Sequence, residues 1–238
     1  MFCYNVYMLS RDLRTLQEYR DHAHKTQSTA NETTQRLDRI ETEFRQAFDF
    51  LGKLPDSVSI FGSTRALPSS QEYQQARTLA ARFVAEKDFA IVTGGGPGIM
   101  EAANRGALEA GGVSAGLTIE LSTGEAINEY MNQSLRFHYF FARKMALSFA
   151  ASMYIFFPGG YGTMDEFFEL ITLVQTRKIE RIPIFCIGTS YWQPLRRLME
   201  HYMLNPDGYI SEADLGLFTI TDDLDLVIEC AKYCQVRH

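Results

Sequence analysis

Cysteine is scarce in this 238-residue chain, and long apolar runs are missing. The four cysteines are too few and too dispersed to form a disulfide framework, the usual support of small secreted domains. No stretch approaches the roughly 20 consecutive apolar residues that a membrane helix needs. The apolar start, Met1 to Leu9, lacks the preceding basic region of a signal peptide and runs straight into Arg11 and Asp12. We therefore expect a cytoplasmic protein.

A concentrated run of basic residues is also absent. The formal net charge is -6, and the 23 lysines and arginines are scattered among 29 acidic residues. We do not expect nucleic-acid binding, because neutralising many phosphates needs a concentrated basic face. A small anion held in a local pocket remains compatible with this charge. The composition, 46% hydrophobic and 22% charged, is typical of an ordinary folded protein.

No pattern of metal ligands stands out. Cys230 and Cys234 would share a helix face, but no second pair of ligands accompanies them, so packed thiols are favoured over a metal site. His22 and His24 are two residues apart and would not share a helix face. The sequence therefore predicts neither a metal site nor a cofactor.

The first part of the chain differs from the rest. Residues 13–51 are polar overall, with apolar residues at the spacing of an amphipathic helix: Leu37, Ile40, Phe44, Ala47, Phe48 and Leu51. The turn residues of Gly52 to Asp56 follow as a linker. We expect an N-terminal helical extension over residues 1–54 and one α/β domain over residues 55–238.

Beyond the linker, short apolar runs alternate with segments of helical period. The runs predict six strands, at residues 58–61, 90–92, 115–119, 154–157, 184–187 and 217–220. Strand, helix, strand repeated in this way predicts an α/β fold with a doubly wound parallel sheet. One helical stripe lies between the first two strands: Tyr73, Ala76, Leu79, Ala80, Phe83 and Val84. In the next helix, Pro97 suits the first turn, and Gly111 and Gly112 end it.

A glycine-rich loop, residues 93–101, leaves the second predicted strand and opens a helix. Its glycines, Gly94, Gly95, Gly96 and Gly98, would let the backbone approach a ligand, and the free N–H groups at a helix start attract an anion. The spacing is not that of the dinucleotide fingerprint, and no Gly-Lys-Ser/Thr of a Walker loop occurs. The alternative is a tight turn with no ligand.

A second such loop, residues 157–166, leaves the fourth predicted strand. Two loops of this kind at the carboxyl ends of strands in one sheet can face a common crevice, where doubly wound folds bind ligands. Thr163 and Glu166 fit a capping box, which is the structural alternative for the glutamate. The pairing of Asp165 with Glu166 favours chemistry instead, because paired carboxylates can orient water or stabilise positive charge on a sugar.

The second loop resembles the Pro-Gly-Gly-x-Gly-Thr-x-x-Glu signature of the Lonely Guy family. Residues 158–166 read Pro-Gly-Gly-Tyr-Gly-Thr-Met-Asp-Glu, and Arg143-Lys144-Met145 lies upstream. The resemblance spans roughly residues 57–187. It implies a Rossmann-like nucleotide-binding fold, a homodimer, and hydrolysis of cytokinin riboside 5′-monophosphates, and often AMP, to a free base and ribose 5-phosphate. Many members were once labelled lysine decarboxylases.

The resemblance also implies roles for single residues. Arg143 and Glu166 would be the catalytic pair, with Asp165 beside them. Glu125 and Lys144 would contact the nucleotide. The phosphate would be held by the second loop, with help from the first loop and the first strand-to-helix turn: Gly159, Gly160, Tyr161, Gly162, Thr163, Gly94, Gly95, Gly96, Gly98 and Ser63. Without the resemblance, Arg143 and Lys144 fit a solvated helix face.

The sequence departs from the short members of the family at the first turn, which reads Phe61-Gly62-Ser63-Thr64-Arg65 where they have Cys-Gly-Ser-Ser. The base therefore stays open. A non-catalytic nucleotide or molybdenum-cofactor carrier is the main alternative, although a carrier needs the loops and not the carboxylates. A pyridoxal-phosphate lysine decarboxylase is disfavoured, because the chain is short and Lys144 has no recognisable aldimine context. The aromatic segment from Phe137 to Phe149 is compatible with a dimer interface or with buried core.

Overall fold

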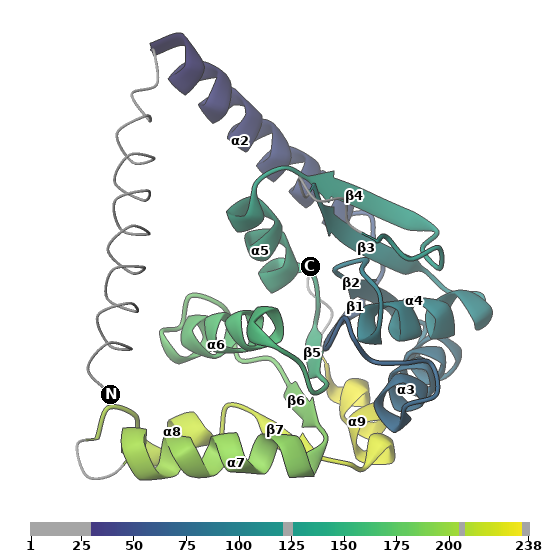
Figure 1. Cartoon of the computed structure of the whole chain (residues 1–238), viewed down its shortest axis with the longest axis vertical. Helices are drawn as coiled ribbons and strands as arrows, with labels where there is room; N and C mark the ends of the chain where they lie inside the picture. Colours follow the sequence, from purple (N-terminus) through teal and green to yellow (C-terminus); the bar gives the residue numbers. More distant parts are fainter. Residues whose placement is uncertain (1–29, 121–125, 205–207, 235–238) are drawn as a thin grey trace, which may run out of the picture. The chain divides into compact units, whose positions relative to one another are not determined.

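The computed structural model describes residues 30–120, 126–204 and 208–234. Among them, seven parallel strands form one sheet in the order β4-β3-β2-β1-β5-β6-β7 (Figure 1). The strands are β1 (Ser57–Phe61), β2 (Ala90–Thr93), β3 (Ser114–Ile119), β4 (Gln133–Phe137), β5 (Met153–Phe156), β6 (Ile184–Ile187) and β7 (Thr219–Thr221). The predicted parallel α/β sheet is confirmed.

Helices precede the first strand, follow the last and lie between most of the others in the described part of the chain. They are α2 (Ala30–Leu51), α3 (Gln71–Lys87), α4 (Ile99–Glu109), α5 (Phe140–Phe149), α6 (Tyr161–Gln175), α7 (Thr189–Met199), α8 (Glu212–Leu215) and α9 (Leu224–Cys230). A π-helical turn, Glu200–Leu204, follows α7, and a short 3₁₀ turn, Ala231–Tyr233, follows α9. No helix among the described residues is long and apolar enough to cross a membrane.

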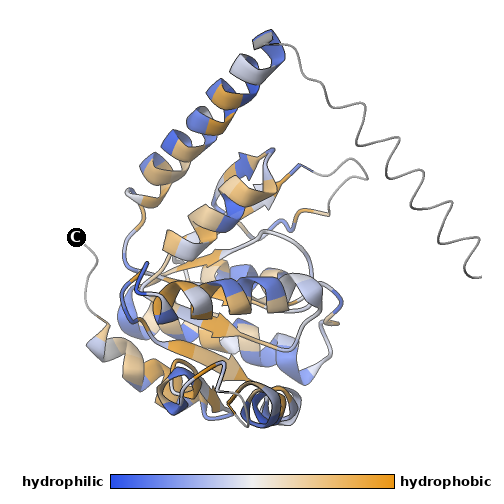
Figure 2. Cartoon of the chain, turned by 90° about the vertical axis from the view of Figure 1, so that its left-hand side faces the viewer, coloured by the Kyte–Doolittle hydropathy of each residue, from blue (hydrophilic) through white to orange (hydrophobic). Residues whose placement is uncertain are grey.

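Side chains alternate between the two faces of the sheet, so each strand contributes to two cores. In β1, Val58 and Ile60 pack with α3, α4 and α9, whereas Phe61 packs with α5, α6 and α7. The buried residues of α3 are five of the six predicted for its stripe, and Val84 packs at its edge. Figure 2 shows the hydrophobic strands between helices whose outer faces are hydrophilic. The sheet is therefore covered on both faces, as the doubly wound prediction requires.

β4 was not predicted from the sequence. It lies at the edge of the sheet, and most of its residues, Gln133 to Arg136, are exposed or only half-buried. A strand in such a position does not need the continuous apolar run by which buried strands are recognised. A smaller correction concerns Pro97, which precedes α4 instead of entering it, because Gly98 is the N-cap residue. Gly111 and Gly112 follow α4, as predicted.

The chain divides into two compact units, Met1–Thr42 and Glu43–His238, and the division falls within α2. The predicted N-terminal helix is present as α2 over the described part of that segment. The boundary at residue 54 between an extension and the α/β domain stays a prediction.

Candidate functional site

All strands are parallel, but the side of the sheet to which the chain adds strands reverses between β1 and β5. From β1 the chain adds β2, β3 and β4 on one side, and β5, β6 and β7 lie on the other. In doubly wound folds such a switch point opens a crevice at the carboxyl ends of the strands. The loops that leave β1, β2 and β5 meet at this edge, and both predicted glycine loops are among them.

Hydrogen bonds of Ser63 connect the three loops. Its N–H donates to the carbonyl oxygen of Pro158 at 3.0 Å, and its carbonyl oxygen accepts from the N–H of Ile99 at 3.0 Å. Gly98 lies so close that a Cβ added to it would come within 2.3 Å of the Ser63 oxygen, and its φ of +71° also favours glycine. The two glycine loops therefore lie on one side of the molecule, on either side of the turn after β1.

The first glycine loop is packed under side chains. All four of its predicted glycines are buried. A Cβ at Gly94 would lie 2.2 Å from Nη2 of Arg143, and one at Gly96 would lie 2.6 Å from the terminal methyl of Met100. A side chain at either position would displace the end of Arg143 or Met100, because these side chains lie directly on the backbone. The loop thereby positions Arg143.

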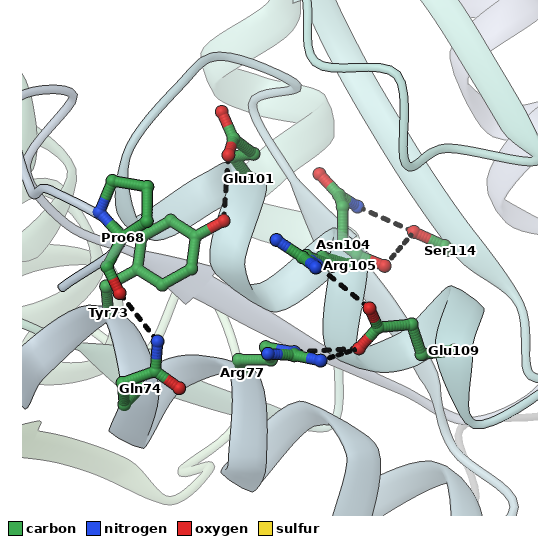
Figure 3. A network of polar contacts seen from close by, with 9 residues as sticks. All are labelled: Pro68, Tyr73, Gln74, Arg77, Glu101, Asn104, Arg105, Glu109 and Ser114. Carbon is green, nitrogen blue, oxygen red and sulfur yellow. Dashed lines mark hydrogen bonds and ion pairs between the residues drawn. The ribbon is translucent and has the colours of Figure 1, made fainter.

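Two asparagines that the sequence analysis did not single out hold this loop from below. The N–H of Asn128 donates to the carbonyl oxygen of Gly95, and its side-chain amide donates to that of Gly96, both at 2.9 Å. The Asn104 side chain accepts from Asn128 and from the hydroxyl of Thr93, and donates to Ser114 Oγ. Figure 3 shows the bond from Asn104 to Ser114 and, in the same region, the ion pair between Arg77 and Glu109 that joins α3 to α4. In the sequence, Asn104 could have been recognised only as a polar residue among the apolar residues on one face of α4.

The second glycine loop is open, in contrast to the first. Gly160, Tyr161 and Gly162 are exposed, and a Cβ at either glycine would meet nothing within 4 Å. These residues start α6, whose first turn contains no acidic side chain. The N–H groups at the start of this 15-residue helix and its dipole favour a bound anion. Tyr191 holds the loop by donating a hydrogen bond to the carbonyl oxygen of Gly159.

The structure excludes the capping box, which was the structural alternative for Glu166. α6 begins at Tyr161 with Gly160 as its N-cap residue, so Thr163 and Glu166 already lie inside the helix. Thr163 is buried and packs against Gly159. Glu166 follows one turn after the open end of the helix, and capping does not account for it.

Glu166 is almost fully buried, with 7% of its surface exposed. Burial raises the pKa of its carboxyl to about 7. The charges of Lys144 and Arg143 lower this pKa, whereas those of Glu169 and Asp165 raise it. Because its pKa is near neutral, the group can exchange a proton at physiological pH.

The side chains of Arg143 and Lys144 lie within the protein, so the solvated helix face is excluded. Arg143, on α5, is 9% exposed, and its Nε donates to the carbonyl oxygen of Leu117 at 2.6 Å. Its Nη2 donates to Gly94 at 3.3 Å. Lys144 Nζ lies 2.7 Å from Oδ2 of Asp165 and 3.0 Å from Oε2 of Glu169. Glu125 falls outside the described residues.

The cysteines of the carboxyl-terminal segment are not part of this edge. Cys230 and Cys234 pack against the core that contains α9. Burial raises the pKa of both thiols, which keeps them protonated. Among the described residues, no group of three or more histidine, cysteine, aspartate and glutamate side chains could hold a metal ion.

Comparisons with known proteins extend this description. A family model described as "Possible lysine decarboxylase" matches residues 100–230. A cytokinin riboside 5′-monophosphate phosphoribohydrolase from Rhodococcoides fascians is 27% identical over 182 residues, which cover 75% of this chain and 90% of that protein. The residues matched by the family model include the whole second glycine loop.

Solved structures are similar as well. The molybdenum cofactor binding protein from Rippkaea orientalis has a TM-score of 0.54 at 18% identity, over 76% of this chain and 97% of that one. The molybdenum cofactor carrier protein from Chlamydomonas reinhardtii has a TM-score of 0.55 at 18% identity, over 76% of this chain and 98% of that one. At these identities the likeness concerns the fold alone.

Proposed function

The chain belongs to the family described as possible lysine decarboxylases, to which the Lonely Guy proteins belong, and from that membership we propose that it is a nucleoside 5′-monophosphate phosphoribohydrolase. It would cleave the N-glycosidic bond of a purine nucleotide, with or without an N6 modification, to give the free base and ribose 5-phosphate. The name of the Rhodococcoides fascians relative agrees with this reaction.

One observation carries the proposal: an open helix start and a buried carboxyl with a near-neutral pKa lie one turn apart on α6. The loop from Gly159 to Thr163 would take the 5′-phosphate at the N–H groups of the helix start. Glu166, whose pKa is about 7, would then lie near the sugar of the same nucleotide. An anion site alone would suit any nucleotide-binding protein, whereas the adjacent carboxyl supports catalysis.

Water would displace the base at the anomeric carbon. As the bond from that carbon to the base nitrogen breaks, the sugar acquires oxocarbenium character, which the carboxylate of Glu166 would stabilise. Glu166 would also accept a proton from the attacking water, and the base would leave with the electron pair of the broken bond and take up a proton. Asp165 would assist at the edge of the site.

The remaining predicted residues would position the nucleotide. Arg143 would orient it from α5, where the carbonyl oxygens of Leu117 and Gly94 hold the guanidinium. Ser63 and the buried glycines Gly94, Gly95, Gly96 and Gly98 would shape the floor of the phosphate site. Glu125 would supply an acidic contact to the nucleotide.

The alternatives are weaker for different reasons. A non-catalytic nucleotide or molybdenum-cofactor carrier shares the fold, but it has no use for a buried, near-neutral carboxyl beside the phosphate site. A lysine decarboxylase would need a lysine amine that loses its proton readily to form an aldimine. Burial lowers the pKa of Lys144, but the ion pairs with Asp165 and Glu169 outweigh it and raise that pKa overall, which opposes such a role.

The decisive experiment is incubation of the full-length protein with a panel of nucleoside 5′-monophosphates that includes AMP and N6-isopentenyl AMP. Chromatography would detect the free base, and a coupled assay the ribose 5-phosphate. We expect release from at least one purine nucleotide and none from the matching nucleoside, because the phosphate anchors the substrate. Tight binding of a nucleotide without product would favour the carrier.

We also propose a homodimer. Three phenylalanines of α5 are exposed by 42–52%: Phe140, Phe141 and Phe149. Phe48 is exposed by 53% and pairs with Phe149 at a ring-centroid distance of 6.4 Å. An aromatic surface of this kind is typical of an interface. Sedimentation should give twice the chain mass, and Phe141→Glu should shift it toward the mass of one chain.

A further inference from the structure

The ammonium group of Lys144 is enclosed by two carboxylates of one helix. Its Nζ lies 2.7 Å from Oδ2 of Asp165 and 3.0 Å from Oε2 of Glu169. These acidic residues are four positions apart, so they share one face of α6, whereas Lys144 comes from α5. The three side chains therefore link the two helices that carry Arg143 and Glu166.

Glu169 is the more enclosed of the two acidic partners. Its side chain is 30% exposed against 58% for Asp165, and its Oε2 is buried. A charge pair interacts more strongly where less water screens it. Only 19% of the Lys144 side chain is exposed. Its rotation toward a substrate would separate the ammonium from both Asp165 and Glu169. The arrangement favours one fixed place for the ammonium.

We propose that Glu169 is a positioning residue of this site: together with Asp165 it holds the Lys144 ammonium beside the carboxyl of Glu166. Lys144 then acts on the proposed catalytic carboxyl and not on the substrate phosphate. The inference rests on the proposed function, because it assigns a role toward Glu166 in that reaction. Glu169 lies three residues beyond the signature motif, and its role is visible only from the packing of α5 against α6.

The proposal predicts opposite shifts in the pKa of Glu166 when the charge of Glu169 or that of Lys144 is removed. The charges of four groups act on the carboxyl of Glu166, namely those of Lys144 and Arg143 from α5 and those of Asp165 and Glu169 from its own helix. Removing the negative charge of Glu169 should lower the pKa of Glu166, because a repulsion is lost. Removing the ammonium of Lys144 should raise it, because an attraction is lost. If Glu169 positions the ammonium, the shift caused by Lys144→Met should also be smaller in the Glu169→Gln background, whereas two independent charges would give the same shift in both backgrounds.

The test is titration of Glu166 in the full-length protein by carboxyl ¹³C NMR without substrate, with the signal assigned by Glu166→Gln. Relative to the unchanged protein, we expect the midpoint to fall in Glu169→Gln and to rise in Lys144→Met, each by about half a pH unit or more. Lys144→Arg, which keeps the charge, should move it less than Lys144→Met. Asp165→Asn should lower the Glu166 midpoint by less than Glu169→Gln does. If the Glu169→Gln protein does not fold, Asp165→Asn takes its place in the test. Glu180→Gln and Lys178→Met, both exposed and outside the site, are the matched controls.

Turnover separates this inference from the proposed function. The pH at which the rate of AMP hydrolysis is half-maximal should move in the same directions, and the KM of Glu169→Gln should stay within about twofold. Equal or same-sign shifts of the NMR midpoint in the two variants would overturn the inference. So would a Lys144→Met protein whose KM rises while Glu166 titrates unchanged, since Lys144 would then bind the phosphate. Absence of hydrolysis in the unchanged protein contradicts the proposed function alone, because the NMR titration needs no turnover.

Discussion

The main-chain N–H of Ser63 donates a hydrogen bond to the carbonyl oxygen of Pro158 over 3.0 Å. This bond joins the turn after β1 to the loop after β5, while the carbonyl group of Ser63 reaches the start of α4 on the other side. Both glycine loops consequently lie at the carboxyl ends of the strands beside the topological switch point, where doubly wound folds bind ligands. A single bound phosphate contacted from both sides is compatible only with this arrangement, and opposite placement would have excluded it.

Replacing Glu166 with glutamine should lower kcat for a nucleoside 5′-monophosphate by about 100-fold or more, because the amide can neither accept a proton nor carry the compensating negative charge. Nucleotide binding, measured by calorimetry, should persist, since the phosphate site lies at the start of α6. The exposed Glu180→Gln change provides the control. Unchanged turnover would remove Glu166 from the mechanism.

The rate should depend on pH through the ionisation of Glu166. Its pKa is about 7, and the carboxylate is the active form in the proposed reaction. We therefore expect kcat/KM to rise with pH between about 6 and 8 and then to level off. A pH series of initial rates with AMP measures this directly. A rate that falls over the same interval would indicate that the protonated acid is required.

The contribution of Glu166 to the free energy of unfolding should fall as pH rises, whereas the rate should increase. The pKa of Glu166 is raised in the folded protein from 4.5 to about 7, so the folded state holds this proton more tightly than the unfolded state. The resulting stabilisation is fully present below about pH 4.5 and is lost as pH rises through 7. Glu166→Gln should gain stability relative to the unchanged protein between pH 5 and 8, by roughly 3 kcal/mol at most. Urea denaturation at several pH values tests the trend, and a constant difference would contradict it.

Gly98 should tolerate no side chain, whereas Gly111 should accept one at a moderate cost. Both have a positive φ, +71° and +78°, but a Cβ at Gly98 would approach the Ser63 oxygen to 2.3 Å, and one at Gly111 would meet nothing within 4 Å. Gly111→Ala should cost about 1 kcal/mol in free energy of unfolding. Gly98→Ala should cost at least about 2 kcal/mol more, because backbone must move. Equal losses in urea denaturation would show that the contact with Ser63 is unimportant.

The order of strands and helices could be predicted because buried strands appear in a sequence as short apolar runs. Runs such as residues 58–61 and 184–187 are of this kind, and both are strands. β4 was missed since an edge strand needs no such run. The capping-box alternative at Thr163 failed because α6 begins two residues earlier, at Tyr161.

By itself, the sequence determined the parallel α/β architecture, the two glycine loops and the acidic pair Asp165 and Glu166, because these follow from local patterns of residue type and spacing, whereas Arg143 became a candidate only through the family resemblance. Tertiary structure alone decided that the first loop is buried under Arg143 and Met100, that the second is open, and that the pKa of Glu166 is about 7. It also brought Glu169 to Lys144 across two helices. Burial and charge pairing depend on which surfaces pack together, and a local pattern does not specify that packing.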